Sequence, residues 1–344
     1  MKKLSKERRL WLIAHQKRIE RRRNLPRRQN KISRSSHVDI LSAPERMCFE
    51  DNYEEVAFFF NKFRKKALSF TSRKKFSIDF EPINFISPGA ALVLAAELDR
   101  WRKTHDIKLK PWKPKKWHPR VKRLFDEMGL FSLLEIKKKD KNLKNSDDYL
   151  RFFKFLTGKA SDGEIADKLM KSMGPALGAE YNEERLYIAM SEAMTNVVQH
   201  AYPENENFKY PILPNQWWTA GSFNRKSKMM TVLFYDQGVG IPATLPKQNF
   251  WQDIISVISG KYLLTNQGAL ILGALEVGRT RSKLAHRGKG LRQCLDFSLR
   301  SKDGNIIIMS DCGGYKESPD SEPIIYQYKN PLGGTFIQWR VKLD

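Results

Sequence analysis

Cysteine is scarce in this chain, and long apolar runs are absent. The 344 residues include three cysteines, Cys48, Cys294 and Cys312, which are spread widely along the sequence. Their spacing matches neither a disulfide framework nor a zinc-binding motif, so we expect reduced, buried thiols. No segment has the roughly 20 apolar residues of a membrane-spanning helix, and no apolar signal region follows the basic N-terminus. The sequence therefore predicts a cytoplasmic protein without a membrane segment.

Acidic residues are too few to balance the basic ones. The formal net charge is +24, and residues 1–150 hold 38 of the 62 Lys and Arg residues but 19 of the 38 Asp and Glu residues. The excess is densest in residues 1–35, which predict a basic helix ending near Pro26. Such a density attracts polyanions through counterion release, but it is also typical of a solvated tail. A contact with nucleic acid or an acidic partner through residues 1–35 therefore stays open.

The pattern of apolar residues divides the chain into four segments. We predict a basic N-terminal helix or tail (1–39), an α/β domain (40–136), a charged linker (137–149) and an α+β domain (150–344). In the α/β domain, the expected elements are strands at 76–80, 83–87 and 107–112 and helices at 88–103 and 118–134, the last running past Gly129.

The second domain has the pattern of helices packed on an antiparallel sheet. Helices are expected at 149–160, 162–174, 183–202, 251–262, 266–278 and 290–300. Strands are expected at 216–224, 228–236, 304–311, 323–329 and 334–342.

Three polar residues recur at every fourth position in an otherwise apolar segment. Glu192, Asn196 and His200 share one face of the helix predicted over 183–202. An asparagine amide oxygen is a hard ligand suited to Mg²⁺, and a nearby carboxylate can polarise a water or hydroxyl. The spacing is also typical of an ordinary helix with one polar edge, so it does not identify a site by itself.

A second segment, TVLFYDQGVGIP, ends a predicted strand in a glycine-bearing turn. Asp236 stands at the strand end and is followed by Gly238, Gly240 and the apolar Ile241. Glycines allow the backbone to approach a ligand closely, and a carboxylate can accept a hydrogen bond from an exocyclic amine. Taken alone, this pattern is also typical of a plain turn.

A third segment, GRTRSKLAHRGKGLRQCLDF, combines glycines, positive charge and a helix start. Gly288 and Gly290 precede a helix predicted from Leu291, and free amides at a helix N-terminus bind anions. The basic residues around these glycines are Arg279, Arg281, Lys283, Arg287 and Lys289. In a fourth segment, GGTF, the hydroxyl of Thr335 enters the last predicted strand.

In this order, the four segments resemble the N, G1, G2 and G3 boxes of the Bergerat-fold ATPases, a superfamily that includes DNA gyrase and the histidine kinases. The resemblance covers residues 150–344 and finds each box on its expected element: helix, strand end, helix start and last strand. The variant ExxxNxxxHAY is most similar to the anti-sigma-factor serine kinases. The resemblance implies a two-layer α/β sandwich that binds ATP with Mg²⁺.

The resemblance also implies a role for individual residues. Asn196 would ligate Mg²⁺, Glu192 would be the general base, and Asp236 would accept a hydrogen bond from the adenine amino group, supported by Thr335. The other implied ATP-binding residues are His200, Gly238, Gly240, Ile241, Arg279, Arg281, Gly288, Lys289, Gly290 and Leu291.

Two of these roles stay open. Residues 243–287 would be a mobile ATP lid, in which Arg279 and Arg281 either contact the γ-phosphate or belong to a solvated basic loop. For His200, packing beneath the lid and direct catalysis are both compatible with the sequence.

Residues 40–136 resemble the STAS domain of anti-anti-sigma factors. The shared features are a strand pair, a small-residue turn that opens an apolar helix, a further strand, and a helix ending in an LGL-like motif. That family carries a phosphorylated Ser or Thr directly before the turn glycine, where this chain has Pro88, with Ser87 one place earlier. Because proline has no hydroxyl, self-phosphorylation in the manner of that family is not expected.

Two functional hypotheses follow from the resemblances. In the first, the chain is an ATP-binding regulatory protein that slowly hydrolyses Mg-ATP as a conformational switch controlling a regulatory protein partner. In the second, it is a serine/threonine protein kinase of the anti-sigma type that phosphorylates a separate partner. A scaffold without catalysis and a homodimer stay open. A sensor histidine kinase is disfavoured, because no phosphoacceptor histidine on a helical hairpin precedes residue 150.

Overall fold

The computed structural model describes residues 38–70, 76–137, 149–159, 161–177, 183–281 and 290–343. The basic tail predicted over 1–35 and nearly all of the predicted linker lie outside these residues. Within the described ranges, no helix combines the length and the apolar character needed to cross a membrane.

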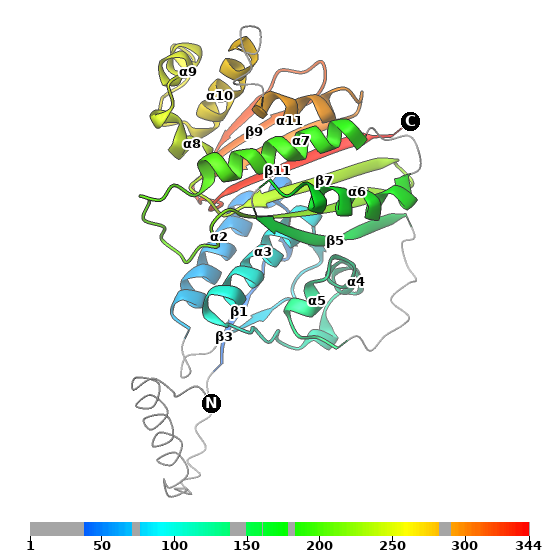
Figure 1. The fold of residues 1–344 in the computed structure, drawn as a ribbon. Coiled ribbons are helices and arrows are strands. Elements are labelled where there is room, and N and C mark those ends of the chain that lie inside the picture. Colours follow the sequence, from blue (N-terminus) through cyan, green and yellow to red (C-terminus); the bar gives the residue numbers. More distant parts are fainter. Residues whose placement is uncertain are drawn as a thin grey trace, which may run out of the picture. The chain divides into compact units, whose positions relative to one another are not determined.

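A seven-stranded sheet organises the fold, and every neighbouring pair of its strands is antiparallel (Figure 1). In spatial order the strands are β10 (Ile324–Gln327), β9 (Gly313–Glu317), β8 (Asn305–Ser310), β11 (Thr335–Lys342), β7 (Met229–Asp236), β6 (Gln216–Asn224) and β5 (Leu150–Lys159). The five strands predicted between 216 and 342 are confirmed, whereas β9 was not predicted. Helices and an antiparallel sheet together confirm the α+β class.

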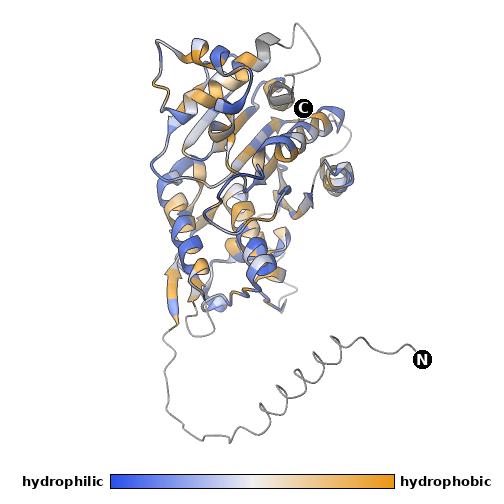
Figure 2. Cartoon of the chain, turned by 60° about the vertical axis from the view of Figure 1, so that its left-hand side comes forward, coloured by the Kyte–Doolittle hydropathy of each residue, from blue (hydrophilic) through white to orange (hydrophobic). Residues whose placement is uncertain are grey.

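Helices that follow β5 along the chain cover one face of this sheet. They are α6 (Gly163–Leu177), α7 (Glu183–Asn196), α10 (Gln267–Arg281) and α11 (Gly290–Leu299). Alternate strand residues, among them Trp217, Phe234, Ile308 and Trp339, point into the core beneath them. Where they are coloured in Figure 2, these helices carry both hydrophobic and hydrophilic residues, as expected for helices with one buried face.

The opposite face of the sheet is also buried, under α2 (Phe49–Leu68) and α3 (Pro88–His105). The intervening strand residues, such as Trp218, Tyr235 and Phe336, share one hydrophobic core with these two helices. The predicted segments 40–136 and 150–344 are therefore in direct contact through the sheet.

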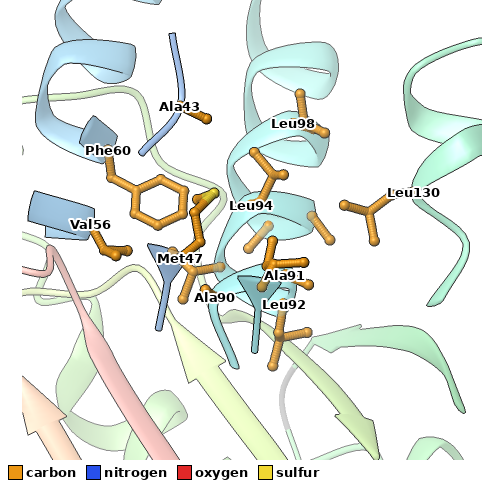
Figure 3. Packing of buried hydrophobic residues seen from close by; sticks show 14 of the residues in the cluster. Ala43, Met47, Val56, Phe60, Ala90, Ala91, Leu92, Leu94, Leu98 and Leu130 are labelled. Atoms are coloured by element: carbon orange, nitrogen blue, oxygen red, sulfur yellow. The ribbon is translucent and has the colours of Figure 1, made fainter. Parts of the chain in front are cut away.

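Helix α3 forms where the sequence predicts it and is buried on nearly every side. The Ser87 hydroxyl accepts a hydrogen bond from the N–H of Ala90, and Pro88 occupies the first helical position, where no amide donor is needed. All residues from Gly89 to Trp101 are buried. Figure 3 shows Leu94 of this helix packed close to Met47 and to Phe60 of α2.

Shorter elements complete the N-terminal segment. Two parallel pairs join β1 (Asp39–Ser42) to β3 (Phe76–Asp79) and β2 (Arg46–Met47) to β4 (Phe85–Ile86). The remaining helices described in this segment are η1 (Pro114–Lys116), α4 (Pro119–Met128) and α5 (Leu130–Leu133).

Three predictions of secondary structure are wrong. The helix expected at 149–160 is the strand β5, and a register shift between Phe153 and Leu156 explains the error. Because a bulge displaces the alternation of side chains, Phe152 and Phe155 face one core while Phe153 and Leu156 face the other, which imitates helical spacing.

The other two errors lie in the N-terminal segment. The helix expected to run past Gly129 stops there, because Gly129 adopts a left-handed conformation (φ +89°) and caps α4 before α5 begins. The strand expected at 107–112 is reduced to one bridge between Trp112 and Asp79.

Candidate functional site

Three polar side chains form a row across the ends of adjacent strands. Asp236 of β7 is the register partner of Thr335 of β11, and Thr335 is the partner of Ser310 of β8. Phe234 and Ile337, two positions from Asp236 and Thr335, face the core beneath α7. Since side chains alternate along a strand, the row lies on the same face of the sheet as α7.

Asp236 is buried, with 4% of its surface exposed. Burial raises the pKa of its carboxyl to about 7, although hydrogen bonds from the backbone N–H groups of Gly238 and Thr335 act in the opposite direction. The Gly238 nitrogen lies 2.8 Å from Oδ1. An ionised carboxylate can accept further hydrogen bonds, so a ligand that donates to it would stabilise the charged form.

Ser310, which was not among the predicted site residues, ties this row to the glycine turn. Its hydroxyl lies 2.9 Å from the Thr335 hydroxyl and accepts a hydrogen bond of 2.7 Å from the N–H of Ile241, the first residue of α8 (Ile241–Thr244). The alternation in NIIIMS places Ser310 on the face of Ile306 and Ile308, and this pattern was the signal available in the sequence.

The turn after β7 is pressed against the end of the helix that carries the polar line. A Cβ added to Gly238 would lie 2.3 Å from the carbonyl oxygen of Ala201, so no larger residue fits there without movement. The Val239 N–H donates to the same carbonyl at 2.9 Å. Gly240 has a φ of +86°, a conformation that favours glycine. The structure thus brings Gly238 against Ala201, in the helical turn that follows α7, whereas Gly240 lies beside Ser310 and Asp311.

Tyr202 explains part of the HAY sequence. Its hydroxyl donates to the carbonyl of Gln216 at 2.8 Å and accepts from the N–H of Gln237 at 3.0 Å. Burial raises the pKa of this phenol well above its ordinary value, so it stays protonated. Tyr202 therefore positions the backbone next to Asp236, a role that the sequence analysis did not assign.

Helix α7 carries Glu192 and Asn196, both partly buried. Burial raises the pKa of Glu192, which lies near the buried thiol of Cys294 on α11. The Nδ2 atom of Asn196 is buried and finds no hydrogen-bond partner among the described residues. A buried donor that makes no hydrogen bond costs free energy. The Nδ2 group of Asn196 is therefore suited to a hydrogen bond with a bound ligand or a metal-bound water.

His200 was expected to continue the line of Glu192 and Asn196, but it does not. The α-helix ends at Asn196 and passes into η3 (Val197–Ala201), a turn of π-helix. Its i→i+5 hydrogen bonds make a wider turn, so His200 no longer follows Asn196 at α-helical spacing. Burial lowers the pKa of His200 and favours the neutral imidazole.

The predicted lid is partly a packed substructure. Helices α8, η4 (Leu245–Lys247), α9 (Trp251–Ile258) and α10 share a small hydrophobic cluster. The side chain of Gln267, at the start of α10, donates to Asp311 at 3.0 Å and accepts from the N–H of Cys312 at 2.7 Å. The N-terminal end of α10 is therefore anchored to the turn between β8 and β9.

The phosphate-binding part of the prediction is only partly within the described residues. Arg279 and Arg281, expected beyond the helix predicted at 266–278, lie in the last turn of α10, whereas Gly290 and Leu291 open α11 where the sequence predicts a helix start. Gly288 and Lys289 lie outside the described residues.

The few metal-ligating side chains described near α7 are compatible with a Mg²⁺ ion that is held mainly by the phosphates of a bound molecule and by water. Across residues 38–343, as far as they are described, no three His, Cys, Asp or Glu side chains form a group that could hold a metal. Mg²⁺ commonly takes one or two protein ligands together with waters and phosphate oxygens, a habit that the single amide of Asn196 fits.

Comparison with protein families and with curated sequences gave no relative. No protein-family model matches this chain, and no curated protein has a significantly similar sequence.

Proposed function

We propose that residues 150–343 bind an adenine nucleotide with Mg²⁺ and that the chain is an ATP-dependent switch controlling a protein partner. The observation that carries this proposal is the buried carboxyl of Asp236 at the end of β7. Burial raises its pKa, so a further hydrogen-bond donor would stabilise the ionised form, and the exocyclic amine of adenine is a donor of suitable chemistry. Gly238 and Gly240 leave the adjoining backbone without side chains, which suits the approach of a flat ring.

The residues of α7 supply the other half of the proposed site. The Oδ1 atom of Asn196 would help to hold Mg²⁺, which neutralises phosphate charge when bound, while its unpartnered Nδ2 group is left to donate to a ligand. Burial keeps the pKa of Glu192 above its ordinary value, which brings it closer to the range of an effective general base. Glu192 would accept the proton of the attacking group and so act in turnover rather than in binding.

The raised pKa of Glu192 also supports a second candidate function. A general base activates a serine or threonine hydroxyl as readily as a water, so a protein kinase acting on a separate partner uses the same site. The two functions differ in where the terminal phosphate goes.

An assay with radiolabelled ATP tests both functions. Proteins captured by the full chain in the presence of a non-hydrolysable ATP analogue would be added to the reaction as candidate partners. Label released as free phosphate supports the ATPase switch, and label on a captured protein supports the kinase. Absence of ATP binding by calorimetry would overturn both.

A further inference from the structure

Helix α2 holds the loop that leads into β11. The carbonyl groups of 330–332 accept, in order, hydrogen bonds from the Tyr53 hydroxyl, the Asn61 amide and the Arg64 guanidinium, at 3.1, 3.3 and 2.6 Å. The carboxylate of Glu54, on the same helix, accepts hydrogen bonds from the backbone N–H groups of Lys329 and Asn330, at 2.7 and 3.2 Å. One helix thus binds several consecutive backbone groups just before Gly333, Gly334 and Thr335.

The strongest of these contacts comes from a buried charge. Arg64 is 2% exposed and pairs with Glu97 of α3, which is fully buried; their Nε and Oε1 atoms lie 2.8 Å apart. Arg100 and the Trp101 indole donate to the other oxygen of Glu97. A buried ion pair is seldom more stabilising than apolar packing of the same volume. What this pair adds is its contact with the loops of the candidate site.

Glu97 contacts the second loop as well. The amide of Gln237, the residue after Asp236, lies 3.4 Å from Oε1 of Glu97. The Tyr235 hydroxyl, 3.5 Å from Arg64, donates to the carbonyl of Gly333 at 2.8 Å. Both turns that shape the surroundings of Asp236 are therefore tied to one ion pair from the N-terminal segment.

We propose that Arg64 and Glu97 are positioning residues of the nucleotide site, so that α2 and α3 set its affinity although they lie on the opposite face of the sheet. The inference rests on the proposed function for its ligand. The guanidinium holds the carbonyl of Leu332 and thereby aligns the N–H of Thr335 with Asp236, while Glu97 holds the turn at Gln237. The N-terminal segment is in this sense part of the site.

The test compares Arg64→Met with Lys65→Met in the full chain. Lys65 is an exposed residue of the same helix, so its variant removes a positive charge without touching the loop. Two quantities are measured on each protein: the affinity for Mg-ATP by calorimetry, and amide hydrogen exchange of residues 330–338. Circular dichroism shows at which temperature each variant is folded.

We expect Arg64→Met to weaken Mg-ATP binding about 10-fold and to speed exchange over 330–336, with α7 unaffected. Lys65→Met should match the wild type in both. In a double-mutant cycle with Asp236→Asn, the losses of affinity should be non-additive if Arg64 acts by aligning the N–H of Thr335 with the Asp236 carboxylate, whereas a general loss of stability gives additive losses. If Arg64→Met does not fold, Asn61→Ala carries the test, with a smaller change in the same direction.

Two results separate failure of this inference from failure of the proposed function. A folded Arg64→Met protein with wild-type exchange and wild-type affinity would overturn the positioning role. If the wild type binds no nucleotide, the proposed function fails and the role in affinity fails with it. Exchange over 330–336 would then decide whether Arg64 holds the loop.

Discussion

Asp236 and Thr335 stand opposite one another on neighbouring antiparallel strands, and the backbone N–H of Thr335 donates a hydrogen bond to the Asp236 carboxylate. The carboxyl is held by two backbone donors and is otherwise deprived of water. The carboxyl is therefore held in a fixed place, where a ligand can add a further hydrogen-bond donor. Changing Asp236 should for this reason have specific consequences.

Asp236→Asn should cost about 100-fold or more in ATP affinity, because an amide replaces the charged acceptor of the adenine amine. The same change should raise the melting temperature at pH 8, because it removes a buried charge that the fold stabilises poorly. Calorimetry measures the first effect and thermal unfolding the second. Normal ATP affinity in this variant would contradict the assignment of Asp236 to the adenine contact.

The stability of the protein should depend on pH through Asp236. An unfolded aspartate has a pKa of about 3.9, whereas burial raises the pKa of Asp236 in the fold to about 7. Between these values the folded state binds more protons, so this contribution to stability is complete below about pH 4 and is lost as the pH rises to 7. The difference in unfolding free energy between wild type and Asp236→Asn, measured across this range, should follow that course.

Nucleotide binding should show the opposite dependence on pH. An amine donor binds the ionised carboxylate, so below pH 7 binding must release a proton, and the affinity should fall about tenfold per pH unit. Calorimetry in buffers of different ionisation enthalpy counts the released proton. Binding without proton release at pH 6 would show that Asp236 does not accept the ligand's donor.

Long, strongly patterned elements could be predicted from the sequence, and so could the order of the site segments. Helix α3 and strands β6, β7 and β11 lie where the apolar pattern places them. Strand β5 was missed because its bulge gives aromatic residues a helical spacing. Helix α2 received no prediction. Its buried residues recur at helical spacing, but three consecutive phenylalanines, 58–60, favour a strand by propensity.

Residues of the candidate site could be predicted where the local position favours one residue type for a specific reason. A glycine pressed on Ala201 and an aspartate at a strand end leave a local signature in the sequence. The contacts of Tyr202 and Arg64 leave none, and the alternation in NIIIMS gives only the face on which Ser310 lies, because the partners of all three belong to strands or helices that meet only after folding. A serine at a strand end is unremarkable until its neighbour across the sheet is known.

Glu192→Ala should retain ATP binding and lose turnover. Its carboxylate is proposed to take up a proton during phosphate transfer, and removing it leaves the Asp236 end of the site unchanged. ATP affinity within about twofold of wild type, together with loss of phosphate release or transfer, is the expected result. Glu184→Ala, an exposed change on the same helix, serves as the control. Full turnover in Glu192→Ala would remove Glu192 from the mechanism.

Ser310→Ala should destabilise the protein by about 1–2 kcal/mol, because it leaves the N–H of Ile241 without its acceptor and removes the contact with Thr335. Denaturant unfolding measures this difference. Ser256→Ala is a suitable control, since that hydroxyl is exposed and bonds only within its own helix turn. Equal stability of the two variants would show that Ser310 does not hold the turn.

Gly89→Ala should weaken the packing of α3 on the sheet. A Cβ at this position would lie 2.8 Å from the ring of Phe336, which is fixed in the core between α3 and β11. Overpacking of this kind costs about 1–3 kcal/mol, more than the gain of up to about 1 kcal/mol from replacing a helical glycine. Denaturant unfolding of Gly89→Ala and of the wild type measures the net change in stability. If Gly89→Ala is stabilised, Gly89 is not a point of close contact, and the N-terminal segment is attached to the sheet less tightly than its buried core indicates.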